Sequence, residues 1–141
     1  MGLIQKQIIE DKTNPFLEML GLDISPNTPV SKLSIGQQQL VEIAKALSKE
    51  AKIIIMDEPT SSLTISETDK LLKVISDLKN EGISIIYISH RLGEVSTCAD
   101  RVVALRDGSN AGTLTKNEIN HDNMVSLMVG RELERLSLIH I

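Results

Sequence analysis

The sequence has almost no aromatic residues, with one Phe, one Tyr and no Trp among its 141 residues. Any hydrophobic core must therefore be built from aliphatic side chains, mainly Ile, Leu and Val. Because 41% of the residues are hydrophobic and 24% are charged, the composition is that of a globular domain and argues against disorder. Short β-branched runs favour a parallel sheet covered by helices, so we predict an α/β fold.

Cysteine is also scarce, since Cys98 is the only one. A single thiol excludes an internal disulfide and a thiolate metal cluster, and it is typical of a reducing compartment.

Residues 1–11 mix charged with apolar side chains and contain no run of signal-peptide or membrane-spanning length, so we expect a cytoplasmic protein. The formal net charge of −4 supplies no positive field for phosphate backbones, and we expect no nucleic-acid partner.

Hydrophobic spacing predicts alternating helices and strands. The predicted helices cover residues 3–21, 36–49, about 66–82, a short segment after residue 90, and 122–129. The predicted strands cover residues 52–56, 83–89 and 101–105, with a small hairpin near the last. Ser34 is placed to cap the second helix, and Ser66 with Asp69 resembles a capping box for the third.

The order strand, helix, strand over residues 52–89 predicts two parallel strands joined by a crossover helix. The C-terminal ends of parallel strands share one edge of a sheet, where open α/β sheets bind ligands. Asp57 and Glu58 follow the first strand, and His90 follows the second. We therefore expect two carboxylates and an imidazole near one another at this edge.

Two adjacent acids after a buried strand suit metal-assisted phosphoryl transfer. Asp57 can hold Mg²⁺ through its waters, while Glu58 can orient or deprotonate the attacking water. The alternative is that Asp57, Glu58 and Pro59 merely end a strand and begin a turn. The acid pair alone does not decide between these interpretations.

Residues 33–39 form a second candidate site. Ser34 and Gly36 lie at the start of a helix, whose free N–H groups and dipole attract phosphate. Taken alone, an ordinary serine cap with a glycine turn also explains this segment, just as a surface loop also explains His90. His121 and His140 have no partners at metal-ligand spacing, so we assign them no site.

Four segments in order resemble the motifs of ATP-binding-cassette (ABC) proteins. Residues 33–39 resemble the signature motif, and residues 53–58 resemble the Walker B strand with its following glutamate. Residues 61–64 are similar to the D-loop, and residues 89–91 to the switch-histidine loop. The resemblance implies an ABC ATPase with a P-loop NTPase-like fold, in which helices cover both faces of a parallel sheet that is incomplete in this chain.

The resemblance also implies three parts. Residues 1–50 correspond to part of the helical subdomain that carries the signature motif. Residues 51–130 correspond to the half of the ATPase core that runs from Walker B to the switch histidine. Residues 131–141 form a tail, in which residues 136–141 fit nothing before them and are open to a non-native origin.

Roles for the motif residues follow from the same resemblance. Glu58 would act as base on the water, His90 would contact the γ-phosphate, and Asp57 would support Mg²⁺, with ATP and Mg²⁺ as the cofactors. ATP held by an opposite subunit would be contacted by residues of the signature motif and the D-loop, namely Ser34, Gly36, Gln37 and Ser62.

Two departures from the usual motifs resemble the monosaccharide-importer branch of the family. Ile35 stands where the signature motif usually has glycine, and Thr64 stands where the D-loop usually has aspartate. Residues 128–133 resemble the end of the first of two fused nucleotide domains in that branch. The implied function is an ATP-binding subunit that couples ATP hydrolysis to monosaccharide uptake.

This function implies partners as well. They are a second nucleotide-binding domain in a head-to-tail pair, membrane permease subunits and, indirectly, a sugar-binding protein. The implied location is peripheral, at the cytoplasmic face of the plasma membrane.

The 141 residues contain no phosphate-binding loop of the form Gly-x-x-x-x-Gly-Lys-Ser/Thr. Because such a loop grips the phosphates with its backbone and its lysine, we expect this chain to be inactive by itself and to be an N-terminally truncated piece of an active ATPase. Two alternatives stay open. One is a non-enzymatic chain that completes a partner's nucleotide site, and the other is an ABC ATPase that serves DNA repair or ribosomes.

Overall fold

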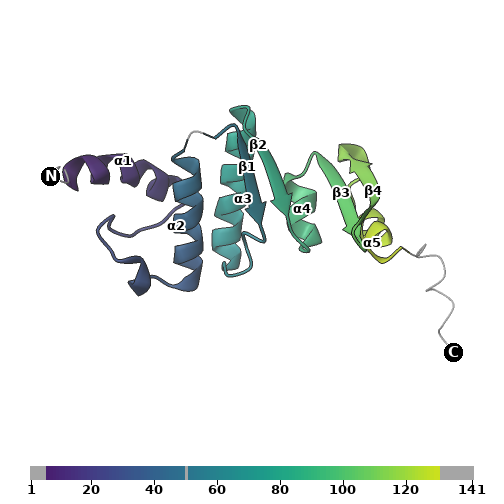
Figure 1. Cartoon of the computed structure of the whole chain (residues 1–141), viewed down its shortest axis with the longest axis horizontal. Helices are drawn as coiled ribbons and strands as arrows, with labels where there is room; N and C mark the ends of the chain where they lie inside the picture. Colours follow the sequence, from purple (N-terminus) through teal and green to yellow (C-terminus); the bar gives the residue numbers. More distant parts are fainter. Residues whose placement is uncertain (1–5, 50, 131–141) are drawn as a thin grey trace. The chain divides into compact units, whose positions relative to one another are not determined.

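The computed structural model describes residues 6–49 and 51–130 and falls into two compact units, Met1–Ile88 and Ser89–Ile141. The first unit contains α1 (Lys6–Met19), a 3-10 turn (Val30–Lys32), α2 (Ile35–Leu47), β1 (Ile53–Asp57), α3 (Ile65–Asn80) and β2 (Ser84–Ile88) (Figure 1). The second contains α4 (Leu92–Cys98), β3 (Arg101–Arg106), β4 (Ser109–Thr115), a 3-10 turn (Lys116–Glu118) and α5 (His121–Val129).

The first unit contains the predicted parallel strand pair. β1 and β2 run parallel, in a register that sets Ile53 beside Ser84 and Asp57 beside Ile88. α3 connects the two strands and packs against β2 (Figure 1). Its buried residues recur every three or four positions and so form one stripe: Thr68, Leu71, Val74, Ile75 and Leu78. The predicted α/β class is therefore confirmed.

β1 is buried on one face only, whereas its continuous apolar run had indicated a buried strand. Ile54 and Met56 are buried, whereas Ile53 and Ile55 are 62% and 66% exposed. Successive side chains of a strand point to opposite faces of the sheet, so the buried and exposed residues alternate. The predicted burial is therefore correct for one face of β1 only, because an apolar sequence shows that a strand can be buried but not which of its faces other elements cover.

α2 begins as the sequence predicted. Ser34 is its N-cap, and the Oγ of Ser34 accepts a hydrogen bond from the N–H of Gln37 at 3.2 Å. α2 packs against α1 and buries Leu40, Ile43, Ala44 and Leu47. These contacts place α2 within the first unit.

The N-terminus of α3 is capped by a different pair from the one predicted. Thr64 is the N-cap, its Oγ1 accepts from the N–H of Glu67 at 3.3 Å, and its own N–H donates to Glu67 Oε2 at 2.8 Å. Because the helix begins at Ile65, Ser66 already lies in the first turn. The prediction of a box from Ser66 and Asp69 was wrong, and Thr64 with Glu67 fits the usual Ser/Thr-x-x-Glu pattern better.

The second unit is a hairpin packed on a helix. β3 and β4 pair antiparallel, with Arg106 opposite Ser109. The two residues between them, Asp107 and Gly108, have φ of 52° and 74°, as a two-residue type I′ turn requires. α5 packs against both strands and buries Met124, so the predicted hairpin and final helix are confirmed.

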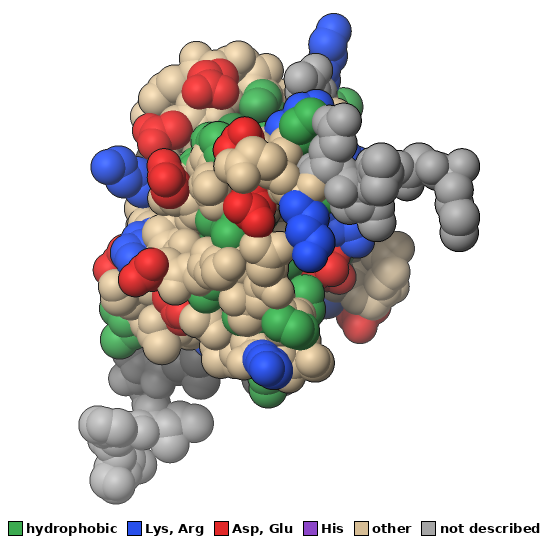
Figure 2. All heavy atoms as spheres, turned by 90° about the vertical axis from the view of Figure 1, so that its left-hand side faces the viewer, with side chains coloured by type: hydrophobic (Ala, Val, Ile, Leu, Met, Phe, Trp, Pro, Cys, Tyr) green, Lys and Arg blue, Asp and Glu red, His purple; other side chains and the backbone are tan. Residues whose placement is uncertain are grey.

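Neither acidic nor basic side chains cluster on the face shown in Figure 2. Both kinds are interspersed with apolar side chains there. No helix in the part of the chain that the structure describes is long and apolar enough to cross a membrane. The predicted tail over residues 131–141 lies outside the described residues. The predicted division of the chain after residue 50 stays a prediction.

Replacing the observed cap of α3 should cost more stability than replacing the predicted one. Thr64→Ala removes the acceptor for the N–H of Glu67 and should lower the free energy of unfolding of the chain by about 0.5–2 kcal/mol. Ser66→Ala should change it by less than about 0.5 kcal/mol. Urea unfolding followed by circular dichroism measures both, and equal losses would contradict the observed cap.

Glu67 should make the stability of the chain depend on pH. Hydrogen bonds from the backbone N–H and the hydroxyl of Thr64 hold the pKa of the Glu67 carboxyl below its ordinary value, because they stabilise the ionised form. Its stabilising effect is therefore present above the ordinary glutamate pKa and is lost as the pH falls through the lower pKa of the folded state.

Glu67→Gln tests this dependence. The variant should be less stable than the wild-type chain at neutral pH, and the difference should shrink as the pH falls to about 3. Glu118, whose pKa is also lowered by hydrogen bonds from Thr115, is present in both proteins and cancels in the comparison. A difference in unfolding free energy that stays constant with pH would show that the Glu67 carboxyl is not held in its ionised form.

Candidate functional site

Two carboxylates lie where β1 ends. Asp57 is the last residue of the strand and is exposed, and Glu58 follows it and is half-buried. The backbone N–H of Glu58 donates to the carbonyl oxygen of Ile88 at 2.9 Å. The acid pair is thereby tied to the end of β2, which confirms that the C-terminal ends of the two strands meet at one edge.

Glu58 has a left-handed backbone conformation, with φ of 45°. For a residue with a Cβ this conformation costs roughly 1–3 kcal/mol, and the residue before a proline is normally extended. The backbone N–H of Glu58 is held by Ile88, its carbonyl oxygen accepts from the N–H of Ser61 at 3.1 Å, and Pro59 and Thr60 behind it are fully buried. Backbone strain concentrates at functional sites, so this conformation independently marks Glu58.

The carboxylate of Asp57 fits a magnesium ion of the kind that nucleotide sites use. Mg²⁺ is usually held by one or two carboxylates, with phosphates and waters completing its shell. Within residues 6–49 and 51–130, no three or more His, Cys, Asp and Glu residues group into a metal cage. Of the two carboxylates at this strand end, Asp57 is the exposed one and so the more accessible donor.

The start of α2 is open to solvent and carries a reciprocal capping box. Ser34 Oγ accepts from the N–H of Gln37, and the N–H of Ser34 donates to Gln37 Oε1 at 3.0 Å. A serine hydroxyl that accepts one hydrogen bond still has its own hydrogen to donate. Ser34 is exposed and Gln37 is half-buried, so a hydroxyl and the positive end of the helix dipole face solvent there.

Gly36 brings this helix start against residues 61–64. A Cβ on Gly36 would lie 2.9 Å from the backbone oxygen of Ser62 and 3.6 Å from Leu63 Cδ2. Because the first of these distances is shorter than a carbon side chain tolerates, only glycine allows the observed approach. The structure therefore joins two predicted nucleotide-contacting residues, Gly36 and Ser62, which come from different motifs.

His90 lies in the second unit, two residues after the end of β2, and is exposed. The backbone around it is held locally, since the N–H of Arg91 donates to Ser89 Oγ at 3.0 Å and the Arg91 guanidinium contacts the Glu94 carboxylate at 3.3 Å. The acid pair belongs to the first unit. The predicted proximity of His90 to Asp57 and Glu58 stays a prediction.

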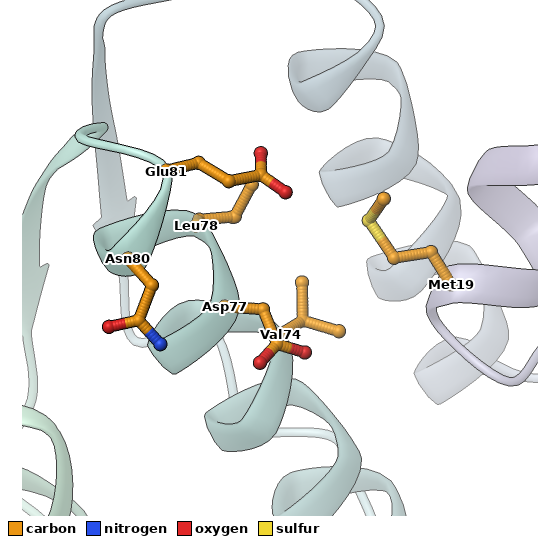
Figure 3. Close-up of a pocket in the computed structure, with 6 residues that line it drawn as sticks. All are labelled: Met19, Val74, Asp77, Leu78, Asn80 and Glu81. Carbon is orange, nitrogen blue, oxygen red and sulfur yellow. The ribbon is translucent and has the colours of Figure 1, made fainter.

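A separate hollow of about 410 Å³ lies near the C-terminal end of α3. Met19 of α1 borders it on one side, with Val74, Asp77, Leu78, Asn80 and Glu81 on the other (Figure 3). Two carboxylates at the negative end of a helix dipole disfavour phosphate. None of the predicted site residues lines this hollow, so it is a poor candidate for the nucleotide.

Glu67 also lies beside the start of α2, although none of the four motifs contains it. Its Oε2 lies 3.4 Å from the position that a Cβ on Gly36 would take, and it also accepts from Thr64. The Thr-x-x-Glu spacing of a capping box was the signal that could have found it.

Comparison with known proteins agrees with this geometry. The family model described as ABC transporter matches residues 3–61, which include the start of α2 and the acid pair. The ribose import ATP-binding protein of Clostridium perfringens (strain 13 / Type A) is 50% identical over 133 residues, which cover 94% of this chain and 26% of the relative. The xylose import ATP-binding protein of Moorella thermoacetica (strain ATCC 39073 / JCM 9320) is 50% identical over 121 residues, covering 86% and 24%. This chain thus spans about a quarter of the length of these relatives.

Solved structures share the fold. The dimeric structure of a bacterial ABC transporter cassette matches with a TM-score of 0.73 at 25% identity, and the match covers 82% of this chain and 50% of that one. A nucleotide-free ATP-binding cassette from an ABC transporter matches with a TM-score of 0.72 at 26% identity, covering 91% and 53%. The strand pair, the acid pair and the capped helix starts are therefore those of a P-loop NTPase cassette, and the chain belongs to the ABC transporter family, of whose ATPase domain it spans a part.

Proposed function

We propose that this chain is part of an ATP-binding subunit that couples ATP binding and hydrolysis to the import of a monosaccharide. The observation that carries the proposal is the 50% identity to a ribose import ATP-binding protein over 133 residues. An alignment of that length includes the signature segment, the acid pair and the residues around His90. A relative named for xylose import is similar to the same degree. We therefore propose a monosaccharide as the imported substrate, without choosing between ribose and xylose.

Glu58 acts as the base in this proposal. Its carboxylate takes the proton of the water whose oxygen attacks the γ-phosphorus, while the bond to the β–γ bridging oxygen breaks and ADP leaves. The half-buried position of Glu58 and its doubly hydrogen-bonded backbone support this role, because a general base must be held in place. Such a base contributes about 10²–10⁴-fold. His90 donates to the γ-phosphate as charge develops on it.

Asp57 holds Mg²⁺, which when bound neutralises charge on the phosphates. The exposed carboxylate at the end of β1 supports this assignment. Ser34, Gly36, Gln37 and Ser62 contact the nucleotide that an opposite domain holds, and the open start of α2 supports this because its hydroxyl and N–H groups suit a phosphate.

A head-to-tail pair of nucleotide-binding domains follows from this arrangement. It is supported by the similar cassette whose structure is dimeric. The pair acts on membrane permease subunits at the cytoplasmic face of the plasma membrane, and indirectly on a sugar-binding protein. The import function named for the relatives supports these partners.

The DNA immediately upstream of the Met1 codon tests the relation of this chain to a complete ATPase. A frame that encodes a glycine-rich Lys-Ser/Thr loop supports the proposal. A stop codon followed by a ribosome-binding site contradicts it and puts the non-enzymatic interpretation first.

The purified 141-residue chain should hydrolyse no ATP, because its sequence contains no loop of the form Gly-x-x-x-x-Gly-Lys-Ser/Thr. Phosphate release from MgATP measures this, with Glu58→Gln as the control for contaminating ATPases. Turnover that Glu58→Gln abolishes would show that the chain does not need the loop.

Glu58→Gln in the chromosomal copy of the gene should lower uptake of labelled ribose or xylose by about a hundredfold or more. Glutamine keeps the shape of the side chain but cannot take the proton of the water. Asp69→Asn is the matched control, since it also neutralises an acid near the start of α3, at an exposed position outside the motifs. Wild-type uptake of both sugars in the Glu58→Gln strain would refute the proposed role of Glu58.

A further inference from the structure

One carboxylate oxygen lies where the starts of α2 and α3 meet. Glu67 Oε2 accepts hydrogen bonds from the N–H and the Oγ1 of Thr64, both at 2.8 Å. The same oxygen lies 3.4 Å from the position of a Cβ on Gly36. Glu67 thus caps α3 and also borders the first turn of α2.

The first turn of α2 packs closely against residues 61–64, with little free space between them. Gly36 and Leu63 are buried, and the Cβ position of Gly36 lies 2.9 Å from the Ser62 carbonyl oxygen. Gly36 therefore lies close to both the backbone of Ser62 and the carboxylate of Glu67. Close-packed neighbours cannot shift independently, so a displacement of one segment must displace the other.

Glu67 also sets the backbone that leads into this contact. Its two hydrogen bonds from Thr64 hold that residue extended, with φ of −69° and ψ of 164°. Thr64 follows Ser62 and Leu63 directly, so the orientation of the Ser62 carbonyl toward Gly36 depends on it. Both helix N-termini favour a negative charge, which suits a carboxylate at this position.

We propose that Glu67 is a positioning residue that couples residues 33–39 to residues 61–64, so that the two segments move as one. The structural link stands without the proposed function. The effect of this link on catalysis rests on the proposed function, in which residues of both segments contact the same nucleotide.

The chain contains a matched control for a role in capping alone. Thr115 and Glu118 form a second box, in which Glu118 Oε2 accepts from the N–H of Thr115 at 2.8 Å and from its Oγ1 at 2.6 Å. This box lies in the second unit, outside the four motifs. Glu118→Ala therefore removes the same hydrogen bonds as Glu67→Ala without touching Gly36.

Amide hydrogen exchange in the 141-residue chain tests the link directly. The first turn of α2 reports through the N–H of Gln37, bonded to Ser34 Oγ, and the N–H of Gln38, bonded to the Ser34 carbonyl at 2.9 Å. Glu67→Ala should speed exchange at both by about tenfold or more, as local opening becomes easier. Glu118→Ala should leave both within about twofold, and Glu67→Gln should restore much of the protection because its amide oxygen still accepts from Thr64.

Gly36→Ala tests the link from the other side and covers the case in which Glu67→Ala fails to fold. The added methyl group must displace Ser62, so exchange should speed up at the N–H of Leu63, which donates to the Thr60 carbonyl at 3.1 Å. The proposal is overturned if Glu67→Ala frays only α3, or if Gly36→Ala leaves Leu63 unchanged.

Steady-state ATPase assays of the complete subunit with its permease test the catalytic consequence. Glu67→Ala should lower kcat by about tenfold to a hundredfold with KM for ATP nearly unchanged, because Glu67 itself does not touch the nucleotide. Glu118→Ala should leave both constants unchanged. A wild-type complex without turnover refutes the proposed function, whereas an active complex that Glu58→Gln inactivates and Glu67→Ala does not slow refutes the positioning role alone.

Discussion

The parallel pairing of β1 with β2 determines where the acid pair and the segment that follows it lie. Their register sets Asp57 beside Ile88, and one further hydrogen bond ties the N–H of Glu58 to the carbonyl of Ile88. A parallel pair requires a crossover, and α3 supplies it by packing against β2. The segment between the end of β1 and the start of α3 is thereby tied to β2 at its first residue, Glu58. Its buried residues, Pro59, Thr60 and Leu63, hold it there.

That short segment explains why two helix starts meet beside it. The cap of α3 at Thr64 ends the segment, and the first turn of α2 packs on it through Gly36. Each helix contributes unpaired backbone donors and a positive dipole end, so the region favours anions. Glu67 is an anion supplied by the chain itself, and its pKa is lowered because the N–H and the hydroxyl of Thr64 donate hydrogen bonds to the ionised carboxylate. Ser34 is exposed at the start of α2, so its hydroxyl and the N-terminus of that helix are accessible to an anion that is not part of the chain.

The site therefore divides into a rigid part and an open part. The backbone of Glu58 is held in a costly left-handed conformation by a hydrogen bond at its N–H and another at its carbonyl, which suits the role in orienting a water molecule that we propose for it. Asp57 and Ser34 are exposed, which suits side chains that meet ligands or another domain. A comparable division is common in enzymes, in which a scaffold holds the reacting group and exposed groups bind the substrate.

The sequence by itself determined the type and order of the elements and the location of the acid pair. Local hydrophobic periodicity, β-branched runs and caps such as Ser34 act over a few neighbouring residues, so they can be read without a partner. The start of α3 was misplaced because two hydroxyl and acid pairs with capping-box spacing, Thr64 with Glu67 and Ser66 with Asp69, overlap in the sequence. Only the tertiary structure decided the left-handed Glu58, the open face of β1 and the approach of Gly36 to Ser62. Each of these depends on which distant segment packs nearby, and such packing has no local pattern in the chain.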